Sequence, residues 1–313
     1  MTKENLVACH NRIKPFIHNT PILSSSLVNN LVNAEVYFKC ENFQKTGAYK
    51  IRGATNAIMQ LTSEQKEKGV VTHSSGNFAQ ALSFAAQSLG VKATIIMPSN
   101  SPKVKKSAVV EYGGYIIECE PTIKARQNTA DSIVKEKGAT FIHPSNDLDV
   151  ILGQGTACLE LLYEQPNLKA VFCPVGGGGL IAGSALAANY FGNNCQVFGG
   201  EPFEADDAYR SLISGKIETN EKTNTIADGL RTQLGQHNFP IIQKHVKQIV
   251  RVSEDEIINA MRFIWERMKI IIEPSSAVTF AAVLKEKSAF KNKKIGVIIS
   301  GGNVDVNNLP FNI

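Results

Sequence analysis

The chain has 313 residues, of which 43% are hydrophobic and 19% are charged, and its formal net charge is +5. These values are ordinary for a soluble globular protein, and the length is sufficient for two lobes. The basic clusters at 103–106 and 291–294 are short and lack interleaved aromatic residues, which favours solvated helix or loop ends. No apolar run approaches the ~20 residues of a membrane span. We therefore expect neither a nucleic-acid partner nor a membrane partner.

The cysteines and the N-terminus indicate a reducing compartment. The six cysteines are far apart and include no Cys-x-x-Cys pair, which argues against a disulfide framework or a zinc site. The first residues are charged and lack the apolar core of a signal peptide. The sequence predicts a cytoplasmic protein.

The N-terminal part predicts a helix, a short extended segment and a second helix. Apolar positions within 5–18 fit one face of a helix. Residues 20–23 are expected to be extended, and the serines at 24–26 to cap a helix from about Leu27. A strand over 36–40 then leads into a loop and a helix that begins near Gly53.

From residue 69 onward, expected strands alternate with expected helices. The strands are 69–73, 93–97, 115–118, 139–143, 170–175, 196–200, 249–252 and 295–299. The helices include 81–89, 102–112, 122–137, 180–191, 254–269 and 275–287, and the polar interval 215–227 is expected to be a surface loop. Ser253 and Glu256 form a capping box at the start of one helix. This alternation predicts an α/β fold with doubly wound, mainly parallel sheet.

Two segments carry residues suited to chemistry. Lys50 lies where a loop meets a helix, next to the ring of Tyr49. A partly desolvated lysine loses some preference for its charged form, and its neutral amine is a nucleophile for aldehydes. The glycines 176–179 follow a strand and open a helix, which suits an anion, because glycine permits close backbone approach and the helix N-terminus offers free N–H groups. The Gly-x-Gly-x-x-Gly spacing of a dinucleotide site is absent.

The segment Lys45-Thr-Gly-Ala-Tyr-Lys-Ile-Arg-Gly-Ala54 resembles the pyridoxal-phosphate lysine segment of the fold-type II enzymes, the group of threonine dehydratase, serine racemase and the tryptophan synthase β chain. Residues 74–80, 174–180 and 300–303 match further segments of that group in the same order. Residues 200–207 and 265–269 are similar to serine racemases in particular. The resemblance runs from about His18 to Asp305.

The resemblance implies a fold with two open, twisted, mainly parallel sheets and flanking helices. It implies a large pyridoxal-phosphate-binding domain (1–52 and 147–313) and a small mobile domain (53–146). Lys50 is implied to bind the cofactor as a Schiff base and, once freed, to take the Cα proton of an amino acid. The glycine loop and Leu180 would hold the phosphate, Ser300 would face the ring nitrogen, Asn77 the ring hydroxyl, and Tyr49 would pack on the ring.

On the substrate side, the resemblance points to a small hydroxy-amino acid. Its carboxylate would meet Ser74, the N–H groups after Ser75, Asn77 and Arg126, with Thr232 nearby. Ser75 would be the second acid–base group. Two residues depart from the group: Phe78 stands where histidine is usual, which leaves the preferred substrate open, and Ser145 replaces an asparagine that contacts the cofactor.

Two accessory sites are implied as well. Glu201 and Asp207, with the carbonyl of Ala205, match a divalent-cation site suited to Mg²⁺ or Ca²⁺. Nine residues match a nucleotide-effector site for ATP, namely Ser25, Ser26, Lys45, Thr46, Gln80, Tyr112, Arg267, Lys269 and Asn303. The group also suggests a homodimer.

Three functions stay in competition at this point. The first is a serine racemase that also eliminates from serine or threonine. The second is a dehydratase of threonine, serine or 3-hydroxyaspartate with little racemisation. The third is a cofactor-binding protein without catalysis, which the joint presence of Lys50, Asn77 and Ser300 disfavours.

Overall fold

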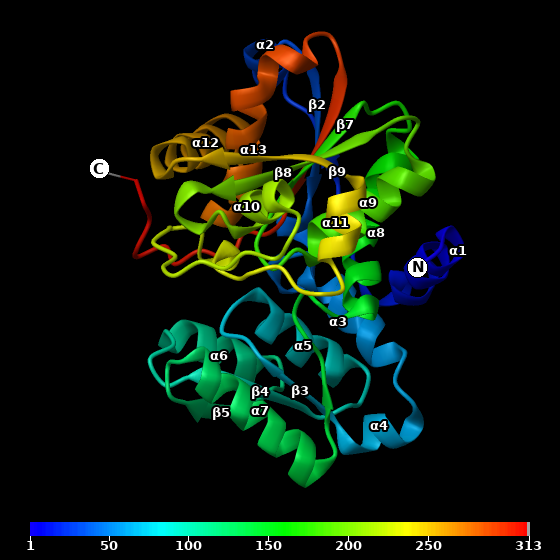
Figure 1. The fold of residues 1–313 in the computed structure, drawn as a ribbon, viewed down its shortest axis with the longest axis vertical. Coiled ribbons are helices and arrows are strands. Elements are labelled where there is room, and N and C mark those ends of the chain that lie inside the picture. The colour runs from blue at the N-terminus through cyan, green and yellow to red at the C-terminus, as the bar shows by residue number, and fades with distance from the viewer. Residues whose placement is uncertain (312–313) are drawn as a thin grey trace.

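The computed structural model describes residues 1–311, whose strands form two open sheets (Figure 1). The larger sheet has the order β1 (Ile22–Leu23), β2 (Glu35–Cys40), β10 (Lys294–Ile299), β7 (Ala170–Pro174), β8 (Gln196–Pro202) and β9 (Val246–Val252). The smaller sheet has the order β5 (Tyr115–Cys119), β4 (Ala93–Pro98), β3 (Val70–His73) and β6 (Thr140–Phe141). All neighbouring strands are parallel except β1 and β2. The predicted fold class is confirmed.

Helices cover both sheets. We call the smaller sheet with its helices the small lobe and the rest the large lobe. The small lobe contains α4 (Ser63–Lys68), α5 (Asn77–Ser88), α6 (Lys103–Glu111) and α7 (Ile123–Lys137). The large lobe contains α1 (Lys3–Ile13), α2 (Ser26–Val32), α8 (Leu148–Glu164), α9 (Gly179–Phe191), α10 (Asp207–Ser214), α11 (Phe239–His245), α12 (Glu254–Met268) and α13 (Pro274–Glu286). Helix α3 (Lys50–Met59) lies where the lobes meet (Figure 1).

The first two expected helices needed correction. Helix α1 ends at Ile13 and not near residue 18, and a 3₁₀ turn with Pro15 follows, because proline lacks the N–H that a continuing helix requires. Helix α2 does begin after Ser25, but the Ser25 side chain makes no capping hydrogen bond. The expectation of a serine cap was therefore wrong. The Ser253–Glu256 capping box of α12 is confirmed.

Other differences concern elements around the lobe junction. Helix α3 begins at Lys50 itself, three residues before the expected start at Gly53. Strand β6 is only two residues long, shorter than the expected 139–143. The sequence analysis assigned no helix to α4, α8, α10 or α11. Helix α8 shows no amphipathic stripe because it is buried on almost every side, so the periodic signal of a surface helix is missing.

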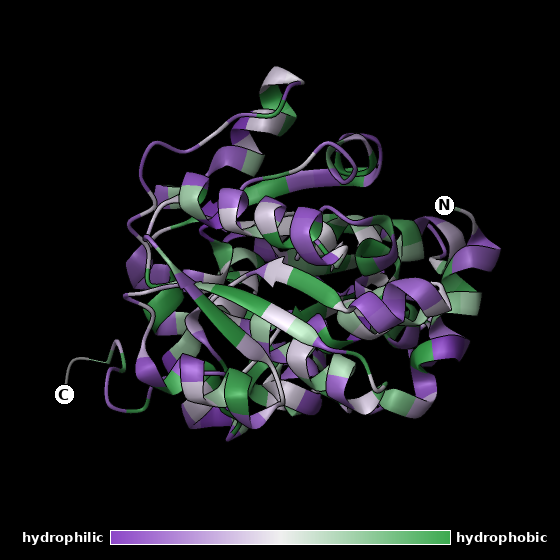
Figure 2. Cartoon of the chain, turned by 90° about the horizontal axis from the view of Figure 1, so that it is seen from below, coloured by the Kyte–Doolittle hydropathy of each residue, from purple (hydrophilic) through white to green (hydrophobic). Residues whose placement is uncertain are grey.

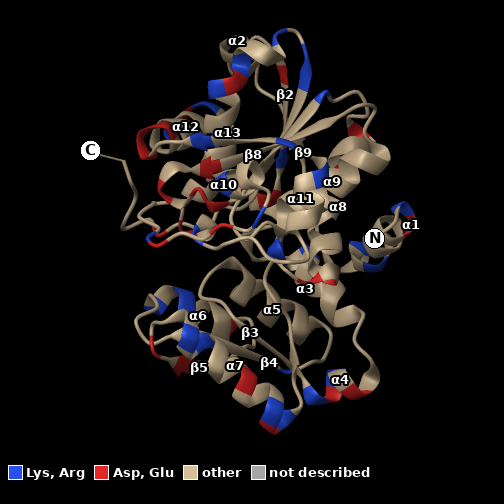
Figure 3. Ribbon diagram, viewed as in Figure 1, with Lys and Arg blue, Asp and Glu red and all other residues tan. Residues whose placement is uncertain are grey.

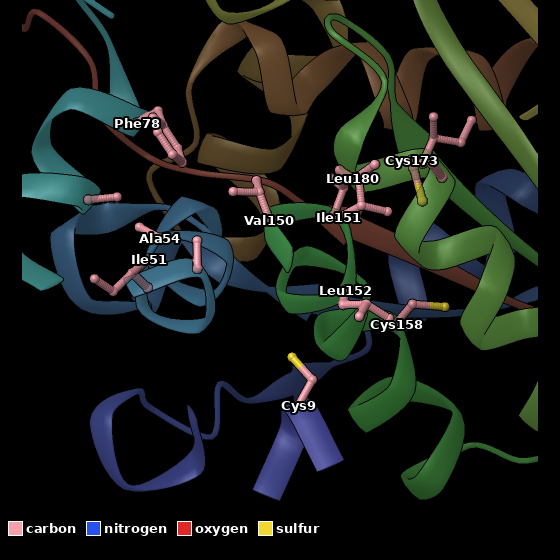
Figure 4. Packing of buried hydrophobic residues seen from close by; sticks show 14 of the residues in the cluster. Cys9, Ile51, Ala54, Phe78, Val150, Ile151, Leu152, Cys158, Cys173 and Leu180 are labelled. Atoms are coloured by element: carbon pink, nitrogen blue, oxygen red, sulfur yellow. The ribbon is translucent and has the colours of Figure 1, made fainter. Parts of the chain in front are cut away.

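A continuous apolar core connects the lobes beside α3 (Figure 4). Ile51 and Ala54 of α3 pack in one cluster with Val150 and Ile151 of α8 and with Phe78 of α5. Figure 2 shows the apolar strands enclosed by helices of mixed hydropathy. A second cluster lies under α12 and α13 on the other face of the large sheet. Helix α3 is thus held by packing from both lobes.

Charged residues of both signs are distributed over both lobes (Figure 3). No helix within residues 1–311 combines the length and the apolar character needed to cross a bilayer. The four strands of the small lobe fall between residues 70 and 141, inside the range expected for the small domain. The boundaries at 53 and 146 and the mobility of that domain stay predictions.

Candidate active site

The amine of Lys50 lies in a partly buried, largely aromatic environment. Its Nζ donates a hydrogen bond to the carbonyl oxygen of Pro144 at 3.0 Å. The ring centroids of Tyr49 and Phe78 are 5.0 and 5.8 Å from that nitrogen. Burial lowers the pKa of Lys50 to about 8, although the carboxylate of Glu273 works in the opposite direction. A lowered pKa increases the neutral, nucleophilic fraction of this amine, to about one tenth at pH 7.

A buried ion network fixes the helix that carries this lysine. Arg52, two residues further along α3, makes paired hydrogen bonds with Glu41 and with Glu160 at 2.7 to 2.8 Å. Lys39 also contacts Glu160, at 2.8 Å. Arg52, Glu41 and Lys39 are fully buried. Removing one member of such a network leaves an uncompensated buried charge, so the start of α3 is strongly constrained.

The N-termini of four helices meet around Lys50. Helix α3 begins at Lys50, and Phe78, whose ring lies over the amine, is the second residue of α5. Glu273, the N-cap of α13, accepts hydrogen bonds from Asn77 at the start of α5. The start of α9 lies beside the Pro144 turn that receives the lysine. Helix starts carry positive dipole charge, so this arrangement favours anionic groups such as phosphate and carboxylate.

The glycine loop forms a cradle that larger residues could not line. A Cβ on Gly177 would collide with the Ser145 hydroxyl, and one on Gly179 with the Gln154 side chain. Gly178 has a φ of +80°, in the left-handed region that favours glycine. Within the first turn of α9 the N–H of Ala182 donates a hydrogen bond to the carbonyl oxygen of Gly178. Earlier N–H groups of a helix have no intrahelical partner, so they are free to bind a phosphate.

Asn77 and Ser300, which were expected to face the cofactor ring, are both held by hydrogen bonds to neighbouring side chains. The Asn77 amide nitrogen donates to both Glu273 oxygens at 3.0 Å, while its oxygen accepts a 3.0 Å hydrogen bond from Asn303. The Ser300 hydroxyl is buried and hydrogen-bonds the Ser276 hydroxyl at 2.9 Å. Burial raises the pKa of Glu273 to about 7, whereas the hydrogen bond from Asn77 lowers it.

The predicted substrate residues are only partly brought together. Ser74 and Ser75 form the turn between β3 and α5, where the Ser74 hydroxyl accepts the Gly76 N–H at 3.3 Å. Arg126 is on α7, and its Nε is buried without a hydrogen-bond partner. Thr232 lies beside the glycine loop, since a Cβ on Gly177 would lie 3.1 Å from its hydroxyl. Thr232 is therefore placed at the glycine loop.

The predicted cation ligands are close neighbours. Glu201, Ala205 and Asp207 are all fully buried. Burial, and in second place the charge of Asp207, raises the pKa of Glu201 well above its usual range; burial also raises the pKa of Asp207 to about 6. No group of three His, Cys, Asp or Glu side chains suited to a metal occurs within residues 1–311. Two buried carboxylates that repel each other, plus a carbonyl, nevertheless fit a hard cation with water ligands.

The nine predicted effector residues fall into two groups. Lys45, Thr46, Tyr112 and Asn303 are linked, because Asn303 donates to the Thr46 carbonyl at 2.8 Å and the ring of Phe84 contacts both Lys45 and Tyr112. Gln80 is buried on α5, next to that group. The other four begin α2 or end α12, namely Ser25, Ser26, Arg267 and Lys269. Across the described part of the chain, no hydrogen bond or ion pair joins the two groups.

Several residues of the site were missed by the sequence analysis. They are Glu273, Ser276, Gln154, Asn238, and Pro144 with its carbonyl acceptor. Each acts through a contact between segments far apart in the chain. The only sequence signal was the position of Glu273 directly before a proline-initiated helix, an N-cap position.

The geometry defines a class of protein: a partly buried lysine of lowered pKa, a glycine cradle at a helix N-terminus and a hydroxyl at the end of β10 fit pyridoxal phosphate. The chain belongs to the family of pyridoxal-phosphate-dependent enzymes, whose sequence model matches residues 13–301.

Comparison with individual members of the family shows which of its enzymes this chain is similar to. The chain is 49% identical over 313 residues to a serine racemase from Dictyostelium discoideum, covering 99% of this chain and 97% of that protein. It is 46% identical over 311 residues to a β-hydroxyaspartate dehydratase from Paracoccus denitrificans, covering 99% of both. The structure of maize serine racemase matches with a TM-score of 0.96 and 43% identity, over 98% of this chain and 94% of that one. Within the family, this chain is therefore a racemase- or dehydratase-type enzyme of the group containing these relatives.

Proposed function

We propose that the protein interconverts L- and D-serine and also converts L-serine to pyruvate and ammonia, with L-threonine as a further substrate for elimination. The observation that carries this proposal is the Lys50 amine, whose pKa is lowered and which lies 5.8 Å from the ring centroid of Phe78, the residue directly after the Ser74–Asn77 turn. One base at Cα is sufficient for elimination. Racemisation needs a second acid–base group on the opposite face, and Ser75 is the candidate.

In this proposal, separate residues bind the cofactor, move the proton and bind the substrate. When bound, pyridoxal phosphate spreads the negative charge left on Cα after proton loss. Lys50 would hold the cofactor and would then take the proton from Cα, and the N–H groups at 176–180 would hold the phosphate. Ser300 would face the ring nitrogen, and a hydroxyl there would not keep that nitrogen protonated as a carboxylate would. Ser74, Asn77 and Arg126 receive the substrate carboxylate.

A second candidate is a dehydratase of 3-hydroxyaspartate, threonine or serine with little racemisation. The relative from Paracoccus denitrificans supports it. Phe78, which is buried over the Lys50 amine, offers no hydrogen-bond donor where the group usually has histidine, so it leaves the preferred substrate open. A substrate with a second carboxylate would need another donor.

Accessory features complete the proposal. We infer a Mg²⁺ or Ca²⁺ ion between Glu201, Asp207 and the Ala205 carbonyl, because a cation would relieve the repulsion between two buried carboxylates. We also infer ATP as an effector, a homodimer, and a cytoplasmic location. The split of the effector residues into two groups fits a site that only a second copy of the chain would complete.

A substrate panel tests the function. L-serine, D-serine, L-threonine and L-threo-3-hydroxyaspartate are each incubated with the holoenzyme, and both keto acid and the enantiomer are measured. The first proposal expects D-serine and pyruvate from L-serine. Turnover of 3-hydroxyaspartate with no D-serine formed would favour the second candidate, and no turnover of any substrate would contradict both.

A further inference from the structure

Asn238, the N-cap of α11, is fully buried beside the glycine loop. Its amide nitrogen donates to the carbonyl of Gly177 at 2.8 Å and to the carbonyl of Ser145 at 3.0 Å. Its amide oxygen accepts the N–H of Gly235 at 3.0 Å. Both amide protons and the oxygen are used, so the orientation of this amide is fixed.

The bond to Gly177 determines where a neighbouring N–H points. In a trans peptide the C=O and the N–H of one plane point in opposite directions. The carbonyl of Gly177 and the N–H of Gly178 share such a plane. Since the carbonyl is held by Asn238, the Gly178 N–H is directed away from Asn238.

Without that bond, the plane between Gly177 and Gly178 could rotate at low cost. Neither residue has a Cβ to restrict its backbone, and Gly178 already has a φ of +80°. A rotated plane would replace an N–H by a carbonyl oxygen on the side that faces away from Asn238. That oxygen would repel a phosphate, whereas the N–H would bind it.

We propose that Asn238 is a positioning residue that fixes the Gly177–Gly178 peptide so that its N–H faces the cofactor phosphate. This inference depends on the proposed role of residues 176–179 in phosphate binding. The same amide also holds the carbonyl of Ser145, next to Pro144, which receives Lys50. One side chain therefore ties the phosphate cradle to the turn behind the lysine.

The test compares the affinities of the apoenzyme for pyridoxal phosphate and for pyridoxal, which lacks the phosphate. The ratio of the two dissociation constants isolates the phosphate contribution, because both compounds carry the aldehyde that reacts with lysine. We expect Asn238→Ala to weaken pyridoxal phosphate binding roughly tenfold and to leave pyridoxal binding nearly unchanged. Asn238→Ser, which keeps a small polar group, should show the same change in ratio.

Two control variants separate the role of Asn238 from the role of the glycine loop itself. His237→Ala removes a ring contact to the Asn146 carbonyl, next to Ser145, but does not reach Gly177, so its ratio should match the wild type. Gly177→Ala tests the loop independently, since its Cβ would collide with Ser145. If Gly177→Ala leaves the ratio unchanged, the phosphate assignment of the loop is wrong.

Suppose that Gly177→Ala weakens the binding of pyridoxal phosphate relative to that of pyridoxal, and that Asn238→Ala does not. Then only the role of Asn238 is overturned. An equal loss of both affinities in Asn238→Ala and Asn238→Ser, or variants whose apoenzyme does not fold, would also overturn it. Either result would show that the amide supports the core and not the direction of one peptide.

Discussion

The amide nitrogen of Asn77 donates to both carboxylate oxygens of Glu273, which joins the start of α5 in the small lobe to the N-cap of α13 in the large lobe. Burial raises the pKa of Glu273 to about 7, against 4.5 for an ordinary glutamate. The folded apoenzyme thus binds a proton that the unfolded chain releases between those pH values.

This pKa has a consequence for stability with a defined sign. Where the folded state binds more protons, the free energy of unfolding decreases as pH rises, here from about 4.5 to about 7. We expect Glu273→Gln to remove this contribution, on the order of 1–3 kcal/mol. Urea unfolding of wild-type and variant apoenzyme at several pH values measures it. Equal pH slopes in the two proteins would contradict the assignment.

Lys50 provides the most direct check of the cofactor site. We expect the purified protein to have a cofactor absorption band, and borohydride to fix the cofactor to Lys50, as peptide mapping would reveal. Lys50→Ala should lose the covalent link and all turnover, because it removes the amine proposed to bind the cofactor and to take the Cα proton. Trapped cofactor on a different lysine would refute the site.

The cation site can be tested by thermal unfolding. Mg²⁺ or Ca²⁺ should raise the melting temperature, because an ion that binds only the folded state stabilises it by mass action. Glu201→Ala should lose this response and keep the cofactor absorption band. Glu204→Ala, which removes an exposed carboxylate of the same turn, should keep the rise in melting temperature with the metal ion. An unchanged response in Glu201→Ala would remove Glu201 from the cation site.

The sequence predicted those parts of the site that depend on local backbone chemistry. Gly176–Gly179 were recognisable because a glycine cradle occupies one short segment, and Lys50 because the segment 45–54 around it resembles the lysine segment of a known enzyme group. Glu273 and Asn238 were not, since they act on partners 196 and 61 residues away. Helix α8 was missed because a helix buried on nearly all sides lacks polar–apolar periodicity.

Two neighbouring lysines on α6 allow a matched test of the contact between the lobes. Lys105 pairs with Asp228 of the large lobe at 2.5 Å, whereas Lys106 pairs with Glu118 within the small lobe at 2.6 Å. Such half-exposed pairs contribute about 0–1 kcal/mol and are screened by salt. We expect Lys105→Ala to raise the KM for L-serine by up to about fivefold and to reduce its salt dependence.

Lys106→Ala should retain the wild-type KM and salt dependence, because its ion pair does not cross between the lobes. The double exchange Lys105→Asp with Asp228→Lys should restore part of the KM. Identical behaviour of the two single lysine variants would show that substrate binding does not depend on the Lys105–Asp228 pair between the lobes.

Ser75 separates racemisation from elimination. Racemisation needs a proton removed from one face of Cα and a proton delivered to the other, while elimination needs only the first step and loss of the β-hydroxyl. In the proposed function, Lys50 would act on one face of Cα. Ser75 is partly buried in the turn that precedes α5. The alternative is that this serine only shapes the turn, as serines at such positions often do.

We expect Ser75→Ala to lose D-serine formation from L-serine and to keep pyruvate formation, because the lysine face is intact. Turnover of D-serine should fall by about two orders of magnitude or more, in line with the loss of a general acid–base group, since its Cα proton points toward the Ser75 face. Ser74→Ala is the neighbouring control: losing a substrate contact raises KM for both products together. Measuring pyruvate and D-serine in one reaction decides between the roles. Equal loss of both products in Ser75→Ala, or racemisation that survives, would remove Ser75 as the second acid–base group and favour the dehydratase.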